Sequence, residues 1–326
     1  MRSNRARRYG GPSAPVGPNA GHGPLAARAG PADLAVPPPP PVPSRLAPAK
    51  VNLGLHVLSR RPDGFHDLAT VFVPLGWSDR LAAAPAPDLT LTTTDPALPT
   101  DGGNLVVRAA VALRQWAAAQ GTAPAGARLH LDKRVPYGAG LGSGSSDAAA
   151  TLRLLAELWD LSVPPADLAA LALGLGSDVP FFLDPVPAHA TGRGERLVRL
   201  VGADGSAWRC PFWLVVAVPD VHVSTAGAFA GVVPSDRGRP DLAAAVVSDD
   251  PGRWRAEVTN DFQRSVETAH PAVRDVRERL EAAGAELAVL SGTGSAVVGV
   301  FGGEAAARRA AAGLGHCRVW VEPPGA

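Results

Sequence analysis

The fold is decided by the stretch Lys133-Arg-Val-Pro-Tyr-Gly-Ala-Gly-Leu-Gly-Ser-Gly-Ser-Ser146, which leads into a predicted helix from Asp147 to Leu158. Glycine lets the backbone turn with positive φ and lets a ligand approach the main chain closely. A helix that begins after such a loop presents unpaired N–H groups and the positive end of its dipole. The pattern therefore predicts an anion site, and phosphate is the usual anion at such a place.

This glycine loop differs from other common phosphate loops. No Gly-Lys-Ser/Thr ends it, so it is not a Walker A loop, and the third glycine of G-x-G-x-x-G is missing. The chain contains neither His-Arg-Asp nor Asp-Phe-Gly, which excludes a protein kinase. A flexible loop between a strand and a helix is the alternative. Ser145 and Ser146 favour the phosphate site, because their hydroxyls can cap the helix or contact a phosphate or its metal.

Length and composition limit the class of protein. The chain has 326 residues, which predicts two domains. Its hydrophobic share of 46% and charged share of 19% are typical of a globular protein. A net charge of +1 gives no electrostatic reason to expect nucleic acid. No apolar run reaches the roughly 18–20 residues of a membrane span, so we expect neither a nucleic-acid nor a membrane partner.

Residues 1–45 are rich in Pro, Gly, Ala and Arg and show no apolar periodicity, which predicts a disordered extension. Several arginines and no acidic residue precede Asp33, a pattern that weakly resembles an organelle transit peptide. The poor amphipathicity instead favours a bacterial extension or a start codon assigned too far upstream. We therefore expect a cytoplasmic location without organelle targeting. Cys210 and Cys317, which lack metal-type spacing, fit a reducing compartment.

The folded part is predicted to begin at Leu46, with a strand over residues 49–58. Apolar residues such as Val51 and Leu53 share one face of this strand, whereas Lys50 and Asn52 share the other. A solvated face is the ordinary explanation for a lone lysine. The alternative is a site that places an ammonium beside a carboxamide.

Periodicity and composition predict the remaining elements. We expect strands over residues 68–81, 89–93, 128–131 and 212–218, and helices over residues 104–119 and 167–175. A further helix is predicted to start at Asn260 and to continue through His270 to Leu280.

Four parts of the chain resemble motifs of one known family and follow one another in the family's order; the first part consists of two short stretches. Residues 133–149 resemble the phosphate-binding motif of the GHMP kinases. Residues 48–53 (Pro-Ala-Lys-Val-Asn-Leu) and 61–66 (Arg-Pro-Asp-Gly-Phe-His) resemble the opening signature of the 4-diphosphocytidyl-2-C-methyl-D-erythritol kinases within that superfamily. Residues 176–180 (Gly-Ser-Asp-Val-Pro) resemble the family's catalytic-aspartate segment, and residues 290–301 its third motif. The resemblance spans about residues 47–321.

The resemblance implies an α+β GHMP kinase fold. Residues 46–205 would form an N-terminal domain like ribosomal protein S5, which binds ATP. Residues 206–326 would form a C-terminal ferredoxin-like domain, and the active site would lie in the cleft between the two.

The resemblance also implies the site residues. Lys50 and Asp178 would be catalytic, although an Asp before an apolar run is by itself most often a cap or turn former. Asn52, Phe65 and His66 would bind the substrate, with Phe65 where tyrosine is more usual. The active-site loop would be Gly292, Thr293 and Gly294. ATP would bind to Pro136, Tyr137, Gly138, Ala139, Gly140, Leu141, Gly142, Ser143, Gly144, Ser145 and Ser146.

Two features of the implied site stay open. Ser143 stands where the family usually has Gly or Ala, which would be strained if this position needs positive φ. ATP is the expected co-substrate and Mg²⁺ the expected cofactor. The resemblance assigns no protein ligand to the metal, for which Ser145 and Ser146 are candidates.

The implied activity is ATP-dependent phosphorylation of a cytidine-diphosphate-linked polyol by a monomer or weak homodimer. One alternative is another GHMP small-molecule kinase, which the Pro-Asp-Gly-Phe-His segment disfavours. A non-catalytic ATP-binding sensor is another, but it would be expected to lose Lys50 or Asp178. A purely structural S5-like interaction module would leave the glycine loop and Asp178 unexplained.

Overall fold

The computed structural model describes residues 42–325. Of the extension predicted over residues 1–45, residues 1–41 lie outside the described part of the chain. β1 (Ser44–Arg60) begins two residues before the predicted start at Leu46. From Val42 onward the chain forms one compact unit, and the division at residues 205/206 stays a prediction.

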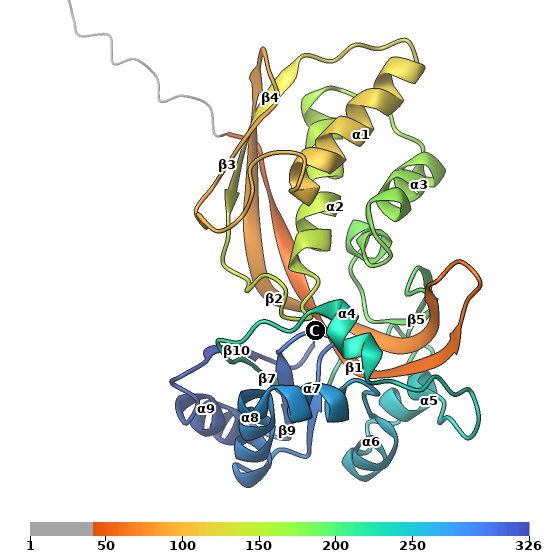
Figure 1. Cartoon of the computed structure of the whole chain (residues 1–326), viewed down its shortest axis with the longest axis vertical. Coiled ribbons are helices and arrows are strands. Elements are labelled where there is room, and N and C mark those ends of the chain that lie inside the picture. The colour runs from red at the N-terminus through yellow and green to blue at the C-terminus, as the bar shows by residue number, and fades with distance from the viewer. Residues whose placement is uncertain (1–41, 326) are drawn as a thin grey trace, which may run out of the picture. The chain divides into compact units, whose positions relative to one another are not determined.

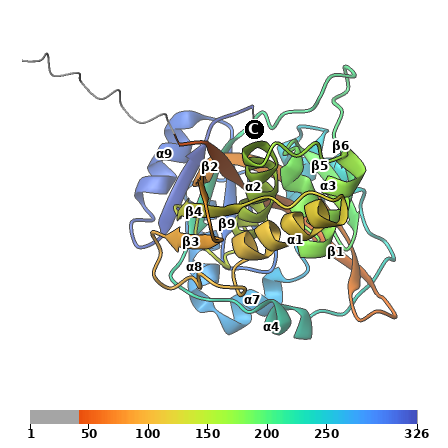
Figure 2. The same cartoon turned by 90° about the horizontal axis from the view of Figure 1, so that it is seen from above.

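The first sheet is built on a long antiparallel hairpin of β1 and β2 (His66–Ala86) (Figure 1). The strand order is β3-β4-β2-β5-β6, with β1 paired to β2. The other strands are β3 (Thr90–Thr93), β4 (Gly126–Asp132), β5 (Ala188–Gly192) and β6 (Arg196–Arg199). Seen from above, the helices of this half lie over the sheet (Figure 2). They are α1 (Leu105–Ala119), α2 (Ser143–Leu158) and α3 (Pro165–Leu175), followed by the 3₁₀ helix η1 (Val179–Leu183).

The second sheet is antiparallel, with the strand order β10-β7-β9-β8. Its strands are β7 (Trp213–Val218), β8 (Leu287–Leu290), β9 (Val297–Phe301) and β10 (Arg318–Glu322). The helices are α4 (Thr225–Ala230), α5 (Leu242–Val246), α6 (Pro251–Glu257), α7 (Gln263–Ala269), α8 (Pro271–Ala282) and α9 (Glu304–Ala312). This strand order, with helices between β7 and β8 and between β9 and β10, confirms the ferredoxin-like half.

The helix predicted from Asn260 through Leu280 is wrong as a single element. It is two helices, α7 and α8, which separate at His270. Pro271 explains the break, because proline lacks an N–H and disfavours helical geometry in the residue before it. His270 accordingly has φ −130° and ψ 83°.

Residues 49–57 of β1 are buried on both faces, which excludes the solvated-face explanation for Lys50 and Asn52. Lys50 is 3% and Asn52 1% exposed. Helix α2 packs against β1. Val51 and Leu53 lie in one hydrophobic cluster with Val216 and Val298 of the second sheet. The two sheets therefore share a core, and β1 carries its polar residues into the junction between them.

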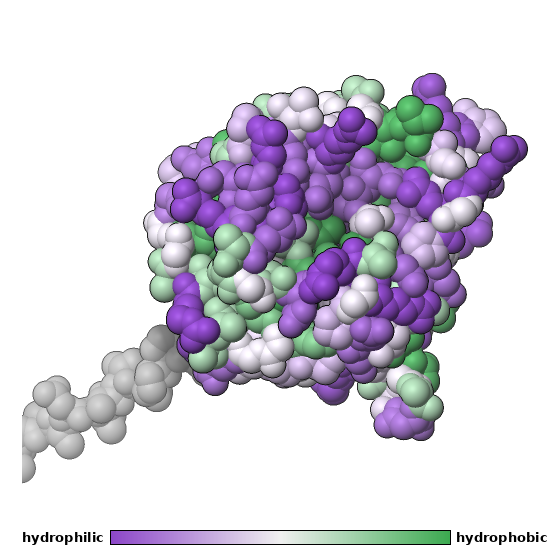
Figure 3. Space-filling model, turned by 90° about the horizontal axis from the view of Figure 1, so that it is seen from below, coloured by the Kyte–Doolittle hydropathy of each residue, from purple (hydrophilic) through white to green (hydrophobic). Residues whose placement is uncertain are grey.

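The surface seen from below is largely hydrophilic, and hydrophobic residues show in a hollow near its middle (Figure 3). Between residues 42 and 325, none of the helices combines the length and the apolar character that a bilayer span requires. The location and the oligomeric state stay predictions.

Candidate active site

The glycine loop ends in a left-handed turn that starts α2. Helix α2 begins at Ser143, four residues earlier than predicted, and Gly142 at its N-cap has φ 68° and no side-chain cap. Ser145 and Ser146 therefore lie in the first turn of the helix and do not cap it. The first amide that donates within the helix is that of Ser146, to the Gly142 carbonyl at 2.9 Å. The N–H groups of residues 143–145 thus remain available to an anion.

Ser143 is the first residue of a helix and needs no positive φ, so its departure from the family pattern costs no backbone strain. Its hydroxyl donates to the Pro136 carbonyl at 3.4 Å, inside the loop. The side chains of Ala139 and Leu141 are buried in the core, so these residues offer a ligand only their backbone. Tyr137 is 63% exposed.

Lys50 is held at the centre of the site by three oxygens. Its ammonium donates to Asn52 Oδ1 at 2.6 Å and to the Gly140 carbonyl at 3.0 Å, and it lies 3.6 Å from Asp178 Oδ2. Burial lowers the pKa of Lys50 from its usual value, and the charge of Asp178 opposes this shift. The nitrogen of the Asn52 amide donates to Thr70 Oγ1 at 2.8 Å, so Asn52 also orients Lys50.

Asp178 occupies the N-cap position of η1, but its carboxylate accepts no capping hydrogen bond. The capping role, which is the commonest for such a residue, is therefore absent. The side chain is 34% exposed and lines the same cavity as Lys50. A carboxylate in this position can reach a ligand.

The turn between β8 and β9 packs directly on the glycine loop. The Ala296 amide donates to the Ala139 carbonyl at 2.9 Å, and Ser291 Oγ donates to the Gly140 carbonyl at 3.1 Å. A Cβ on Gly294 would lie within 3.0 Å of backbone atoms of Ala139 and Gly140. The structure thus brings the third motif against the phosphate loop, although 151 residues separate Ser291 from Gly140.

Aromatic side chains gather at the other end of the site. The ring of His66 stacks on Phe229 of α4, with centroids 4.6 Å apart and an interplanar angle of 25°. Phe65 is 51% exposed, and the guanidinium of Arg193 lies 4.6 Å from its ring centroid. This end of the site offers flat apolar faces to a ligand.

One cavity of about 530 Å³ joins these groups. Of the predicted site residues, it is lined by Lys50, Asn52, Phe65, His66, Gly140, Gly142, Asp178, Gly292 and Thr293. Its walls do not include Pro136, Tyr137, Gly138, Ala139, Leu141, Ser143, Gly144, Ser145, Ser146 or Gly294. A larger cavity of about 680 Å³ lies beside β8, α7 and α8 and contains none of the predicted residues. We assign the site to the smaller cavity, because it holds the Lys50–Asp178 pair.

Sequence reasoning missed several residues of this cavity. Thr70, Phe229 and Arg193 line it as well. Arg193 lies in the sequence Gly-Arg-Gly-Glu, residues 192–195, whose two glycines indicate a turn. This pattern could have pointed to Arg193. Phe229 and Thr70 carried no local signal, because only the fold brings them to the cavity.

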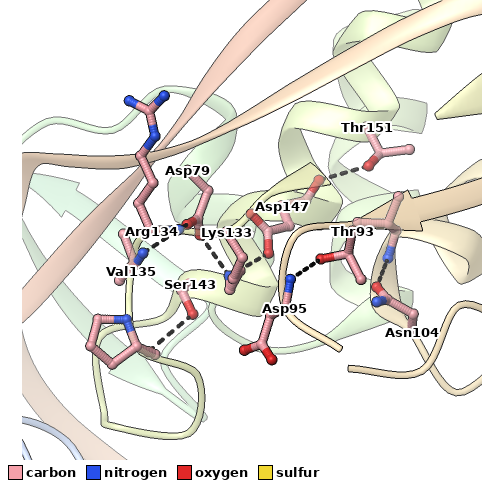
Figure 4. Close-up of polar contacts among 12 residues, drawn as sticks. Asp79, Thr93, Asp95, Asn104, Lys133, Arg134, Val135, Ser143, Asp147 and Thr151 are labelled. Carbon is pink, nitrogen blue, oxygen red and sulfur yellow. Dashed lines mark hydrogen bonds and ion pairs between the residues drawn. The ribbon is translucent and has the colours of Figure 1, made fainter. Parts of the chain in front are cut away.

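A buried charge cluster of Asp79, Lys133 and Asp147 lies where the chain enters and leaves the glycine loop (Figure 4). Lys133 Nζ lies 2.6 Å from Asp79 Oδ2 and 2.7 Å from Asp147 Oδ2. Asp79 also accepts from the backbone amides of Arg134 and Val135, at 2.6 and 2.8 Å. Asp147 Oδ1 is buried without a hydrogen-bond partner in the part of the chain that the structure describes. The cluster ties the start of α2 to β2 and to the strand end that leads into the loop.

Asp147 should make the stability depend on pH. Burial raises the pKa of its carboxyl from 3.8 to about 7; the charge of Lys133 opposes this shift, and that of Asp79 adds to it. The folded state then keeps a proton that the unfolded state has released, so the free energy of unfolding should fall between about pH 4 and 7. Asp147→Asn, which cannot titrate, should lose this part of the dependence in urea unfolding measured across that range. Equal pH slopes for both proteins would show that Asp147 is already ionised in the fold.

Comparison with known proteins places this geometry in a family. The model described as "GHMP kinases N terminal domain" matches residues 104–184, and "GHMP kinases C terminal" matches residues 242–317. A 4-diphosphocytidyl-2-C-methyl-D-erythritol kinase from Salinibacter ruber is 53% identical over 265 residues, which cover 81% of this chain and 92% of the relative. The enzyme of that name from Prosthecochloris aestuarii is 41% identical, over 81% of this chain and 90% of its own length.

Solved structures agree with the sequence relatives. A crystal structure of 4-(cytidine 5'-diphospho)-2C-methyl-D-erythritol kinase matches with a TM-score of 0.71 and 39% identity, covering 87% of this chain and 99% of the other. A homoserine kinase from Cytophaga hutchinsonii matches with a TM-score of 0.62 but 16% identity, over 87% and 95% of the two chains, which supports the fold alone. The chain therefore belongs to the GHMP kinases and, within them, to the 4-diphosphocytidyl-2-C-methyl-D-erythritol kinase family.

Proposed function

We propose that the protein transfers the γ-phosphoryl group of ATP to the 2-hydroxyl of 4-diphosphocytidyl-2-C-methyl-D-erythritol, in non-mevalonate isoprenoid precursor biosynthesis. The observation that carries the proposal is the cavity that joins the Lys50–Asp178 pair to the aromatic residues Phe65 and His66. Its two ends suit the two ends of this acceptor, a hydroxyl-bearing polyol and a cytidine. The 53% identity to a relative with this name supports the same activity.

The phosphates of ATP would bind along the glycine loop over residues 136–146. The free amides at the start of α2 and the helix dipole both attract a polyphosphate. The close contact between Gly294 and the loop backbone holds the loop in one shape. Phosphoryl transfer depends mainly on such positioning and on charge stabilisation.

The chemical step would use Asp178 as the general base. Its carboxylate accepts the proton of the 2-hydroxyl while that oxygen bonds to the γ-phosphorus. The bond between the γ-phosphorus and the bridging oxygen breaks, and ADP leaves with the electron pair. The Lys50 ammonium, 3.6 Å from the Asp178 carboxylate, would offset the negative charge that develops during transfer.

Mg²⁺ is expected to enter with ATP. Mg²⁺ takes oxygen ligands, which carboxylates and hydroxyls can supply. Asp178 supplies a partly exposed carboxylate, and the half-buried Ser145 lies in the free first turn of α2. The buried Ser146 lines a different cavity, beside Arg45 and Arg153, and fits less well. Among residues 42–325, no cluster of three His, Cys, Asp or Glu side chains could hold a metal. Bound Mg²⁺ would neutralise charge on the β- and γ-phosphates.

The cytosine ring would lie against Phe65, because base–aromatic stacking tolerates either Phe or Tyr. Phe65→Ala should therefore raise KM for the cytidine-linked acceptor by about 10- to 100-fold, since such stacking contributes about 1–3 kcal/mol per base. KM for ATP should not change, and Phe65→Tyr should behave like the wild type. Steady-state kinetics with each substrate varied in turn would measure this. Equal KM values for the acceptor in the wild type and Phe65→Ala would place the base elsewhere.

The proposed function can be tested by the position of the new phosphate. Phosphorus NMR of the product formed from MgATP and the cytidine-linked acceptor should show one added monophosphate ester on the 2-carbon, and an acceptor without the 2-hydroxyl should give none. A phosphate on any other hydroxyl would contradict the proposal.

A further inference from the structure

Arg193 lies in the tight turn between β5 and β6, whose backbone conformation is well defined. Gly192 and Gly194 on either side have φ of 69° and 110°, which favour glycine. The Arg193 amide donates to Glu195 Oε2 at 2.6 Å, and the Gly194 amide donates to the Thr191 carbonyl at 3.1 Å. The turn is therefore held by its own hydrogen bonds.

The turn that carries Arg193 contacts both ends of the cavity. At one end its guanidinium is 4.6 Å from the ring centroid of Phe65. At the other end, a Cβ on the neighbouring Gly194 would lie 3.4 Å from Asp178 Oδ1. Arg193 and Gly194 thus line the cavity between Phe65, the proposed base-stacking residue, and Asp178, the proposed catalytic base.

The cavity is lined by few positively charged side chains, and that of Arg193 is available to bind an anionic ligand. Lys50 and Arg193 are the lysine and arginine residues that line it. Lys50 already has Asn52 Oδ1, the Gly140 carbonyl and Asp178 around its ammonium. Within residues 42–325 the guanidinium of Arg193 forms no ion pair. Its charge helps to lower the pKa of Asp63, but the ion-pair partner of Asp63 is Arg61, at 3.2 Å. Its charge is therefore free for a ligand.

The proposed substrate supplies an anion at this place. With its cytosine on Phe65 and its 2-hydroxyl at Asp178, the diphosphate that joins the two ends must cross the middle of the cavity. A guanidinium is planar and presents paired N–H donors that match phosphate oxygens. We propose that Arg193 binds the diphosphate of the acceptor and makes the enzyme select diphosphate-linked acceptors; this rests on the proposed function.

A purely structural role for Arg193 is the competing explanation. The cation over the ring could simply hold Phe65 in place. In that case removing Arg193 would weaken every ligand that stacks on Phe65, whether or not it carries phosphate.

Inhibition by cytidine and by CDP separates the two explanations. Both compounds carry the base, but only CDP carries the diphosphate. Their inhibition constants would be measured against the cytidine-linked acceptor at saturating MgATP, for the wild type and Arg193→Gln. Arg196→Gln is the matched control, because Arg196 is an exposed arginine three residues on and does not line the cavity. A double-mutant cycle with Phe65→Ala completes the design.

We expect Arg193→Gln to raise the inhibition constant of CDP about 10- to 100-fold and that of cytidine less than about twofold. The loss should persist in the Phe65→Ala background, and Arg193→Lys should restore part of the affinity. Equal losses for cytidine and CDP, or no further loss once Phe65 is removed, would overturn the inference. Failure of the proposed function is distinct, since wild type would then show no turnover of this acceptor.

Discussion

Asp178→Asn should lower kcat with the cytidine-linked acceptor by about 10²- to 10⁴-fold, the usual contribution of a positioned general base. An amide keeps the size of the carboxylate but cannot accept the proton of the 2-hydroxyl. Among residues 42–325 the Asp178 carboxylate caps no helix and forms one ion pair, with Lys50 at 3.6 Å, so the fold should tolerate the change. ATP binding should be retained, because the phosphates are proposed to bind to the glycine loop and not to Asp178.

The matched control for this variant is Asp184→Asn. Asp184 lies at the other end of the same 3₁₀ helix, is exposed and pairs with Arg199 at the surface. Its loss should leave kcat within about twofold of the wild type, since an exposed ion pair contributes little. Steady-state kinetics and calorimetric titration with a non-hydrolysable ATP analogue would measure both variants. Wild-type kcat in Asp178→Asn would remove Asp178 from the mechanism.

Gly294→Ala should reduce kcat/KM about 100-fold or more. The added Cβ would lie within 3.0 Å of the backbone of Ala139 and Gly140, where real Cβ atoms are essentially never found. Neither side is a flexible side chain, so the phosphate loop must move. A displacement of about 1 Å in a catalytic group can cost about 10²-fold in rate. KM for ATP should rise, because the loop that moves is the one proposed to bind its phosphates.

Gly302→Ala is the control for that change. Gly302 follows β9, has no atom within 4 Å of an added Cβ, and does not have positive φ. Activity should therefore stay near that of the wild type. Circular dichroism melts of both variants would show that each is folded before kinetics are compared. A folded Gly294→Ala with unchanged kcat/KM would contradict the close packing of the two loops.

Much of the site could be predicted because its candidate residues lie in short, recognisable sequence segments. The glycine loop, Lys50 and Asp178 each lie in a local pattern, and the cavity brings them together. The break at His270 was not predicted, although Pro271 in the sequence indicates it. The start of α2 at Ser143 was harder to predict, because a glycine in the left-handed region began the helix in place of a serine cap.

What could not be predicted depends on contacts between distant segments. Asp79 joins Lys133 and Asp147 only because β2 and the start of α2 meet in the fold. Phe229 reaches His66 from a helix 163 residues further along the chain (229 − 66). The second buried face of β1 follows from the packing of α2 and of the second sheet on the same strand. No local periodicity encodes such contacts.

The most direct test of the account is ADP release by the purified protein with MgATP in the presence of different acceptors. It would be measured without acceptor and with the cytidine-linked methylerythritol, homoserine or mevalonate. We expect turnover only with the cytidine-linked acceptor, since only this compound carries the base proposed to stack on Phe65 and the diphosphate proposed to bind Arg193. Turnover with homoserine or mevalonate instead would indicate another GHMP kinase. ATP binding without turnover on any acceptor would indicate a sensor and would contradict the catalytic roles of Lys50 and Asp178.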